Sequence, residues 1–123
     1  MAVVDSGWER ESGDPRVLPG LAIDRAAGKL RVTAADDDRT GHGTGVTRQV
    51  LAIAPEASVV PVRVFGETLE TSPEVIVAAL DHAVEQRVDV VNLSLGTTRE
   101  DALRPLYAAC ERARRAGAIV VAA

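Results

Sequence analysis

The chain has 123 residues, 46% of them hydrophobic, which is enough to bury one core and too hydrophobic for a disordered segment. Aromatic residues make up only 2%, so Val, Ala, Leu and Ile must build that core, which suits buried parallel strands. The net charge of -4 argues against nucleic acid as a partner, because phosphate binding needs clustered Lys and Arg. No apolar stretch of the sequence is long enough to span a membrane.

The start of the chain lacks the pattern of a secretory signal, since Asp5 and Glu9 interrupt the first apolar run. The single cysteine, Cys110, excludes an internal disulfide and falls in an Ala-rich stretch, where a small buried hydrophobe is expected. If the chain is full length, these features indicate a cytoplasmic protein. If it is a fragment, they indicate nothing about location.

The first half of the sequence predicts a strand, a long loop and a helix. Residues 2–5 form an apolar run that ends at Asp5, which is typical of a buried strand. Residues 9–20 predict a loop, and within the ambiguous stretch that follows only residues 29–32 alternate like an edge strand. Residues 43–54 predict a helix that ends at Pro55. Its apolar residues near one face are Val46, Val50, Leu51 and Ile53.

The second half alternates strands with helices. The expected elements are a strand at 57–65, a helix from the Ser72-Pro73 start to about residue 87, a strand at 89–93, a helix at 101–116 and a strand at 118–123. Such alternation predicts an α/β fold with three layers, a doubly wound and mainly parallel sheet with helices on both faces. We expect a single domain over residues 1–123.

Three polar motifs fall at the same edge of this predicted sheet. Asp5 and the turn Ser94-Leu95-Gly96 follow the carboxyl ends of strands, where such sheets place their working residues. His42 lies between two glycines at the start of a helix beside that edge, and glycine lets the backbone approach a ligand closely. We therefore expect these motifs to converge.

An aspartate and a histidine side by side supply two members of a nucleophilic triad. The carboxylate accepts a hydrogen bond from one imidazole nitrogen, and the other nitrogen can then take a proton from a serine hydroxyl. Taken singly, each residue has a structural interpretation instead. Asp5 would cap a turn at the end of its strand, and His42 would be a loop residue without a chemical role.

The run Asp36-Asp37-Asp38 is most simply a solvated loop. The alternative is a hard cation such as calcium, which prefers oxygen ligands close in sequence, although no defined calcium-loop pattern is present. Otherwise we expect neither a metal nor a cofactor. A nucleotide or flavin domain is disfavoured, because Asp5-Ser6-Gly7-Trp8 is no phosphate-cradling loop.

Five stretches, in order along nearly the whole chain, resemble the subtilisin-like serine proteases, the subtilases. They are Val3-Val4-Asp5-Ser6-Gly7, Asp38-Arg39-Thr40-Gly41-His42-Gly43-Thr44-Gly45-Val46, the passage from residue 54 to 64, the strand from 88 to 96, and the final residues 116–123. The resemblance implies a serine endopeptidase domain in which Asp5 orients His42 and His42 is the general base. It also implies that Ser94, Leu95 and Gly96 bind an extended polypeptide substrate.

The chain departs from that family in what it lacks. The family's serine nucleophile follows a Gly-Thr-Ser pattern, and none of the serines stands in that context: Ser6, Ser12, Ser58, Ser72 and Ser94. The oxyanion-hole asparagine would come just after Ala123, and Gly45 stands where a second histidine is usual. We therefore expect the chain alone to be inactive, either as a fragment or as half of a split enzyme whose serine lies on a second chain.

The alternative from another functional class is a non-catalytic pseudoprotease domain. It would bind a peptide or a partner protein through the former substrate cleft. Its two apolar strands, at residues 2–4 and 119–123, lack expected neighbours, and unpaired edges of this kind favour association. A homo-oligomer formed through the exposed sheet edge is therefore a further expectation.

Overall fold

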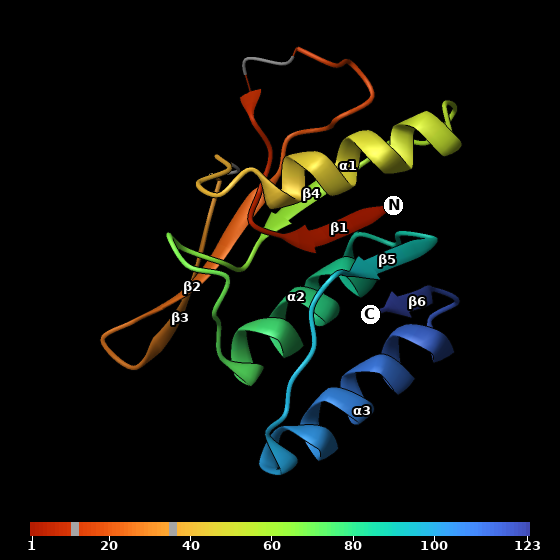
Figure 1. Cartoon of the computed structure of the whole chain (residues 1–123). Helices are drawn as coiled ribbons and strands as arrows, with labels where there is room; N and C mark the ends of the chain where they lie inside the picture. The colour runs from red at the N-terminus through yellow and green to blue at the C-terminus, as the bar shows by residue number, and fades with distance from the viewer. Residues whose placement is uncertain (11–12, 35–36) are drawn as a thin grey trace.

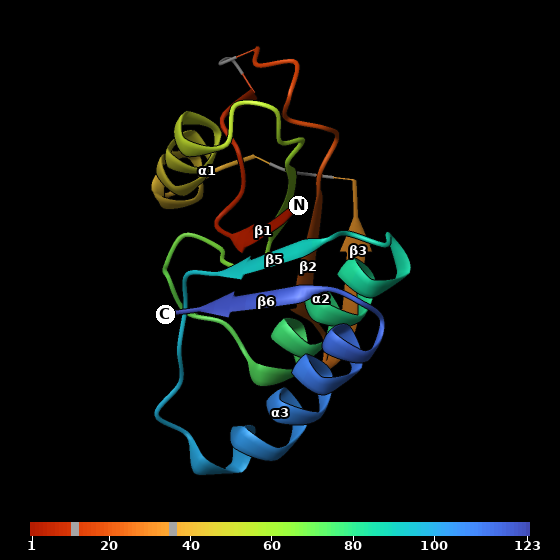
Figure 2. The ribbon, with the colours of Figure 1, turned by 90° about the vertical axis from the view of Figure 1, so that its right-hand side faces the viewer.

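The computed structural model describes residues 1–10, 13–34 and 37–123. Within these residues six strands form one sheet in the order β3-β2-β4-β1-β5-β6, with α1 on one face and α2 and α3 on the other (Figures 1 and 2). The elements are β1 Ala2–Asp5, β2 Leu21–Ala26, β3 Lys29–Thr33, α1 His42–Ile53, β4 Val60–Arg63, α2 Pro73–Glu85, β5 Val90–Leu93, α3 Glu100–Arg115 and β6 Ile119–Ala122. Only β2 and β3 pair antiparallel, which confirms the mainly parallel, three-layer prediction.

The centre of the sheet is β1, whose four residues are all buried. It pairs with β4 on one side and with β5 on the other, so the expectation that the strand at residues 2–4 lacks a neighbour is wrong. The chain reaches β4 through α1, which lies on one face, and reaches β5 through α2, which lies on the opposite face. The carboxyl end of β1 is therefore the point where the winding reverses, and open α/β sheets bind their ligands at such a point. Asp5 occupies it.

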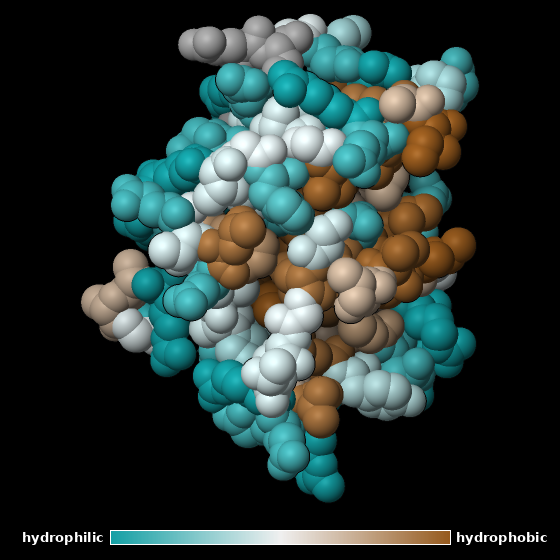
Figure 3. Space-filling model, viewed as in Figure 1, coloured by the Kyte–Doolittle hydropathy of each residue, from teal (hydrophilic) through white to brown (hydrophobic). Residues whose placement is uncertain are grey.

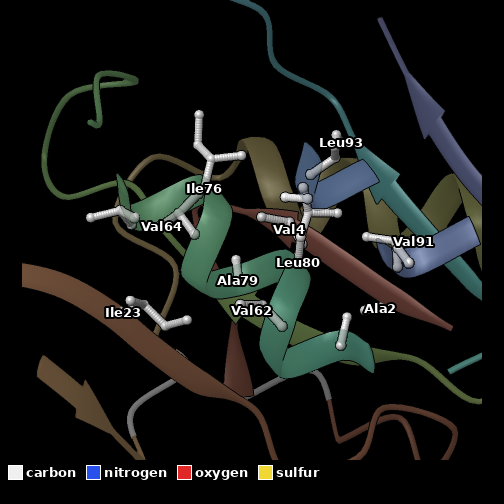
Figure 4. Close-up of a cluster of buried hydrophobic side chains, with 14 of the residues drawn as sticks. Ala2, Val4, Ile23, Val62, Val64, Ile76, Ala79, Leu80, Val91 and Leu93 are labelled. Atoms are coloured by element: carbon white, nitrogen blue, oxygen red, sulfur yellow. The ribbon is translucent and has the colours of Figure 1, made fainter. Parts of the chain in front are cut away.

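The larger core lies between the sheet and the two helices α2 and α3. The apolar pattern of α2 predicts a buried stripe of Val75, Ile76, Ala79, Leu80, Ala83 and Val84, and all of these but the half-buried Val84 are buried. Figure 4 shows α2 over the strands, with Ile76, Ala79 and Leu80 among Val4, Val62 and Val91. The helix begins after Ser72 with Pro73 in its first turn, although the Ser72 side chain makes no capping hydrogen bond. α2 thus holds β1, β4 and β5 in one layer beneath the rim.

The smaller core lies under α1, and here one sequence expectation is wrong. Ile53 was expected on the buried face but is 86% exposed, and the buried residues of α1 are Gly43, Thr44, Thr47 and Leu51. A β-carbon added at Gly43 would lie 2.5 Å from the Gly7 carbonyl oxygen, so the small residues let α1 approach the chain after β1 closely. Ile53 lies about 200° around the helix from buried Leu51 and therefore faces solvent.

The hairpin of β2 and β3 was only half predicted, because the sequence favoured an edge strand at 29–32 alone. Its two-residue turn is Ala27-Gly28, with φ of 49° and 77°. Positive φ at both residues is characteristic of a type I′ turn. Such turns usually carry Asn-Gly, so the Ala-Gly pair does not indicate a hairpin in the sequence. Ala22 and Ile23 of β2 are buried, and β2 extends the sheet beside β4.

The arginine-rich end of α3 is a solvated face, since Arg112 and Arg114 form exposed ion pairs with Asp81 and Glu111. Gly117, with φ of 95°, follows the C-cap residue Ala116 of the helix. Cys110 is half-buried rather than fully buried. In the described part of the chain no helix is long and apolar enough to cross a lipid bilayer.

The two last strands leave part of the sheet uncovered. Val91 and Val120 point into the core beneath, so by strand alternation their neighbours Val90, Ile119 and Val121 point to the α1 side. α1 packs over β1 and does not extend above β5 and β6, and Ile119 and Val121 are 63% and 49% exposed. Figure 3 shows apolar side chains gathered at the right-hand side of the molecule, where β5 and β6 lie. We call Val90, Ile119 and Val121 the open sheet face.

Candidate active site

Asp5 and His42 meet at the carboxyl end of β1. The Nδ1 atom of His42 lies 2.8 Å from Oδ1 of Asp5, whose side chain is fully buried. The same Oδ1 accepts a hydrogen bond from the Ser6 backbone N–H at 2.7 Å. A carboxylate can only accept, so Nδ1 carries the proton and Nε2 is left with its lone pair. The imidazole is 43% exposed, so this second nitrogen is accessible from solvent.

The loop before α1 presents His42 through two glycines with different tasks. Gly41 has φ of 82°, a left-handed conformation that a residue with a side chain rarely adopts. Gly43 follows His42 and lies against Gly7, where the backbone atoms leave no space for a β-carbon. The expectation that glycines permit close backbone approach is thus met at Gly43, although the backbone approached is this chain's own.

The carboxylate of Asp38 organises this loop. Its Oδ1 accepts hydrogen bonds from the Ser6 hydroxyl at 2.8 Å and from the N–H groups of Thr40 and Gly41. Its Oδ2 accepts from both the N–H and the hydroxyl of Thr44. Burial raises the pKa of Asp38, but the hydrogen bonds from Thr44, Ser6 and Thr40 outweigh it and lower the pKa to about 2. Asp38 is therefore charged at any pH near neutrality.

A cavity of about 740 Å³ opens beside His42. One wall is the stretch after β5, including Ser94, Leu95 and Gly96, and the opposite wall is the stretch between β4 and α2. Phe65, Leu95 and Ile76 supply apolar surface. A β-carbon at Gly96 would meet nothing within 4 Å, so the backbone there is open. The structure thus places four of the five predicted site residues on one cavity, with Asp5 buried behind His42.

Sequence reasoning missed the second wall and the task of Asp38. The residues between β4 and α2 that line the cavity, among them Leu69, Glu70 and Thr71, were predicted only as a loop, since they carry no periodicity. Asp38 was grouped with the acidic run. The task of Asp38 could have been inferred from its position four residues before His42, because aspartate readily accepts hydrogen bonds from the backbone N–H groups that follow it.

The serines of the described residues do not complete a triad. Ser94 shares the cavity with His42, but its Oγ accepts a hydrogen bond from Asn92 Nδ2 at 2.8 Å. Ser6 follows Asp5, and its hydroxyl bonds Asp38 instead. Within ranges 1–10, 13–34 and 37–123, no hydroxyl forms a hydrogen bond with His42 Nε2. Ser12 lies outside the described residues.

The acidic run gives no test of the calcium alternative, because Asp36 lies outside the described residues. Of its neighbours, Asp38 uses both oxygens for protein donors, and Asp37 pairs with Arg39 and Arg63. The hydrogen bond from Arg39 is the main reason that the pKa of Asp37 is lowered. In the part of the chain that is described, no group of three or more His, Cys, Asp or Glu side chains could hold a metal ion.

An Asp–His pair at the switch point of a doubly wound sheet, beside a cavity, is the arrangement of a subtilisin-like peptidase. The sequence profile of the Subtilase family (peptidase S8) matches residues 2–123. The chain belongs to this family. The Major intracellular serine protease of Bacillus subtilis (strain 168) is 35% identical over 136 residues, an alignment that covers 100% of this chain and 41% of that protein. The Minor extracellular protease Epr of the same organism is 29% identical and covers 100% of this chain and 19% of its own length.

Solved structures agree on the fold. The Epidermin Leader Peptide Processing Serine Protease (EpiP) of Staphylococcus aureus superposes with a TM-score of 0.82 at 22% identity, over 98% of this chain and 35% of that chain. The S41 Psychrophilic Protease superposes with a TM-score of 0.81 at 28% identity, over 98% and 43%. The chain thus spans well under half of the proteins that it resembles, between 19% and 43% of the four named here.

Proposed function

We propose that this chain supplies the aspartate and the histidine of a serine endopeptidase whose nucleophilic serine lies outside these 123 residues. The observation that carries the proposal is the 2.8 Å contact between His42 Nδ1 and buried Asp5, beside a cavity large enough for several peptide side chains. Membership of the subtilase family supports it.

In this proposal Asp5 keeps His42 in the tautomer that has its proton on Nδ1. Nε2 then takes the proton from the serine hydroxyl as its oxygen attacks the scissile carbonyl carbon, and later gives that proton to the leaving amine. The backbone at Ser94-Leu95-Gly96 pairs with the extended polypeptide substrate, in the manner of an added strand. Apolar substrate side chains occupy the surface formed by Phe65, Leu95 and Ile76.

The chain alone is then inactive. Without a serine hydroxyl that donates a hydrogen bond to His42 Nε2, no acyl intermediate can form. Without oxyanion donors, the tetrahedral intermediate is not stabilised. The serine-bearing part of the enzyme must dock so that its hydroxyl reaches His42. Whether that part continues this polypeptide or belongs to a second chain is decided by experiment.

We assign the open sheet face as the surface that receives this part. This face, made of Val90, Ile119 and Val121, lies on the same side of the sheet as α1 but beyond the area that α1 covers. Exposed apolar surface next to a cavity is typical of a surface that binds a protein partner. Asn92 lies on the same face and bonds Ser94 of the cavity wall, so a partner seated there would border the site. The related proteins are two to five times longer than the matched region, consistent with such a partner.

The test is labelling with a fluorophosphonate probe, which reacts with an activated serine. The purified chain is compared with the same chain mixed with, or fused to, the polypeptide encoded next to it. Labelling only in the presence of the second part, lost in His42→Ala and kept in His82→Ala, supports the proposal. His82 is a matched control because it lies on α2, outside the cavity lining. Labelling that survives His42→Ala contradicts the assigned general base.

The alternative function is a non-catalytic peptide-binding domain. It is favoured by a cavity that is already formed while no hydroxyl of the described residues reaches His42 Nε2. It predicts that a folded chain shows no labelling under either condition yet binds extended peptides, measured by fluorescence anisotropy with a random peptide library. Gly96→Trp should fill the cavity and weaken binding, whereas Ala108→Trp, on the exposed face of α3, should not. Affinity unchanged by Gly96→Trp rejects this alternative.

A further inference from the structure

Asp38 contacts both chain segments that carry the Asp5–His42 pair. Through Oδ1 it accepts the hydroxyl hydrogen of Ser6, the residue directly after Asp5. Through Oδ1 and Oδ2 it accepts N–H groups on both sides of His42, from Gly41 and from Thr44. The Ser6 hydroxyl oxygen in turn accepts the N–H of Gly43 at 2.8 Å. One carboxylate and one hydroxyl therefore tie the end of β1 to the loop before α1.

These bonds replace the usual cap of a helix. α1 begins at His42 after Gly41, which has no side chain to satisfy the first N–H groups of the helix. The N–H groups of His42, Gly43 and Thr44 bond instead to Thr40 Oγ1, Ser6 Oγ and Asp38 Oδ2. The negative charge of Asp38 also lies at the positive end of the helix dipole. The first turn of α1, with His42 in it, thus depends on Asp38 directly and through Ser6.

We propose that Asp38 is a positioning residue that holds the His42 imidazole at hydrogen-bonding distance from Asp5. The proposal concerns the site whose function is proposed above, but the geometry it explains exists in this chain without serine or substrate. Asp38 makes no contact with the cavity and acts only through the loop and Ser6. Its two oxygens accept from five donors, and an asparagine with one acceptor oxygen cannot replace them.

A purely structural interpretation is that Asp38 caps α1 and nothing more. The two interpretations differ at Ser6. Ser6→Ala removes the link from Asp38 to the segment after Asp5 and the bond to Gly43, while Asp38 still caps Thr44. If Asp38 only caps the helix, Ser6→Ala leaves the Asp5–His42 contact intact. If Asp38 positions His42, Ser6→Ala loosens it.

The test reads the tautomer of His42 in the 123-residue chain from the ¹⁵N chemical shifts of its ring at neutral pH. In the wild type the proton lies on Nδ1, because that atom bonds Asp5. We expect Asp38→Ala, Asp38→Asn and Ser6→Ala to shift the ring towards the tautomer mixture of a free imidazole. The amide N–H groups of residues 40, 41 and 44 should exchange with solvent about tenfold faster in both Asp38 variants, as for a lost bond to a charged group.

The matched control is Asp37→Asn, which removes a neighbouring negative charge that pairs with the side chains of Arg39 and Arg63 rather than with the N–H groups beside His42, and which should leave the His42 tautomer unchanged. Should Asp38→Ala fail to fold, Asp38→Asn and Ser6→Ala carry the test. A wild-type tautomer in all folded variants overturns the proposal, even where amide exchange becomes faster, because it would leave Asp38 as a cap alone. The test needs no catalysis, so it stands or falls separately from the probe labelling.

Discussion

At the scale of single residues, the Asp5–His42 contact determines which chemistry the site can perform. Asp5 is fully buried, and its Oδ2 atom has no hydrogen-bond partner among the described residues, so His42 and the Ser6 N–H are what hold this carboxylate in place. Burying a carboxylate is costly unless it is hydrogen-bonded, and that cost is consistent with a site built for function rather than for stability.

Asp5→Asn should abolish most of the activity of the assembled enzyme while leaving the fold intact. The amide can offer its NH₂ group to Nδ1, which would place the imidazole proton on Nε2, the nitrogen that must accept the serine proton. We expect the rate of probe labelling to fall by a factor on the order of 10⁴, the effect of the same change in another triad. Asp24→Asn, which alters an exposed ion pair with Arg31, is the control. Equal loss in both variants would contradict the role of Asp5.

The stability of the chain should depend on pH through Asp38. Its pKa is about 2 in the folded chain against an ordinary value of 3.8, so its stabilising effect is present above 3.8 and is lost as the pH falls through the folded value. Because the side chain is only partly buried, we expect about 1 kcal/mol, less than the shift alone implies. Urea unfolding at about pH 6 and about pH 2 measures the difference in unfolding free energy between the wild type and Asp38→Asn. A difference that is not smaller at the acid pH would rule out this contribution of the Asp38 charge.

At the scale of the elements, the position of α1 depends on Gly43 and not on Gly45, the other glycine of the helix. Gly43→Ala would place a methyl group 2.5 Å from the Gly7 carbonyl oxygen, so α1 must shift, and we expect a loss of about 1–3 kcal/mol. Gly45, two residues on, has nothing within 4 Å of an added β-carbon. Gly45→Ala should therefore stabilise the helix by up to about 1 kcal/mol. Urea unfolding measures the change in unfolding free energy that each variant causes. Changes of the same sign in both variants would contradict the described packing of α1.

The elements also show how far sequence reasoning reaches. The buried stripe of α2 was predicted correctly, because apolar residues at helical spacing leave one face to bury. The contact face of α1 was predicted only in part. Leu51 is buried as expected, but Gly43, Thr44 and Thr47 complete that face, and small or hydroxyl residues carry no hydrophobic signal. β2 was missed for a different reason: the Ala27-Gly28 turn lacks the residues that usually mark a hairpin.

The candidate site also contains parts that the sequence predicts and parts that it does not. Asp5, His42 and the 94–96 turn lie in motifs that the sequence displays, and the structure brings them to one rim. The wall that contains Leu69 and Glu70 is defined by where the chain between β4 and α2 passes, which depends on tertiary packing. The hydrogen bond that the Ser6 hydroxyl donates to Asp38 spans 32 residues and leaves no periodic pattern in the sequence.

At the scale of the whole molecule, we expect the open sheet face to govern association. Ile119→Thr combined with Val121→Thr keeps β-branched side chains suited to a strand while removing apolar surface. We expect the double variant to lose probe labelling in the mixture of the two parts, and to remain monomeric at concentrations where the wild type self-associates. Fluorophosphonate labelling of the mixture measures the first effect, and analytical ultracentrifugation of each variant alone measures the second. Leu103→Thr, on the exposed surface of α3, is the control, and an equal effect there would reject the open sheet face as the docking surface.

The bonds between the described residues that hold His42 in place join only residues from Asp5 to Thr44. In the proposed enzyme, the acceptor of the proton is therefore assembled from a short stretch of polypeptide, independently of the group that gives the proton up. A chain arranged in this way can complete its base while it is still harmless to the proteins around it. Hydrolysis would begin only at the moment when the serine arrives.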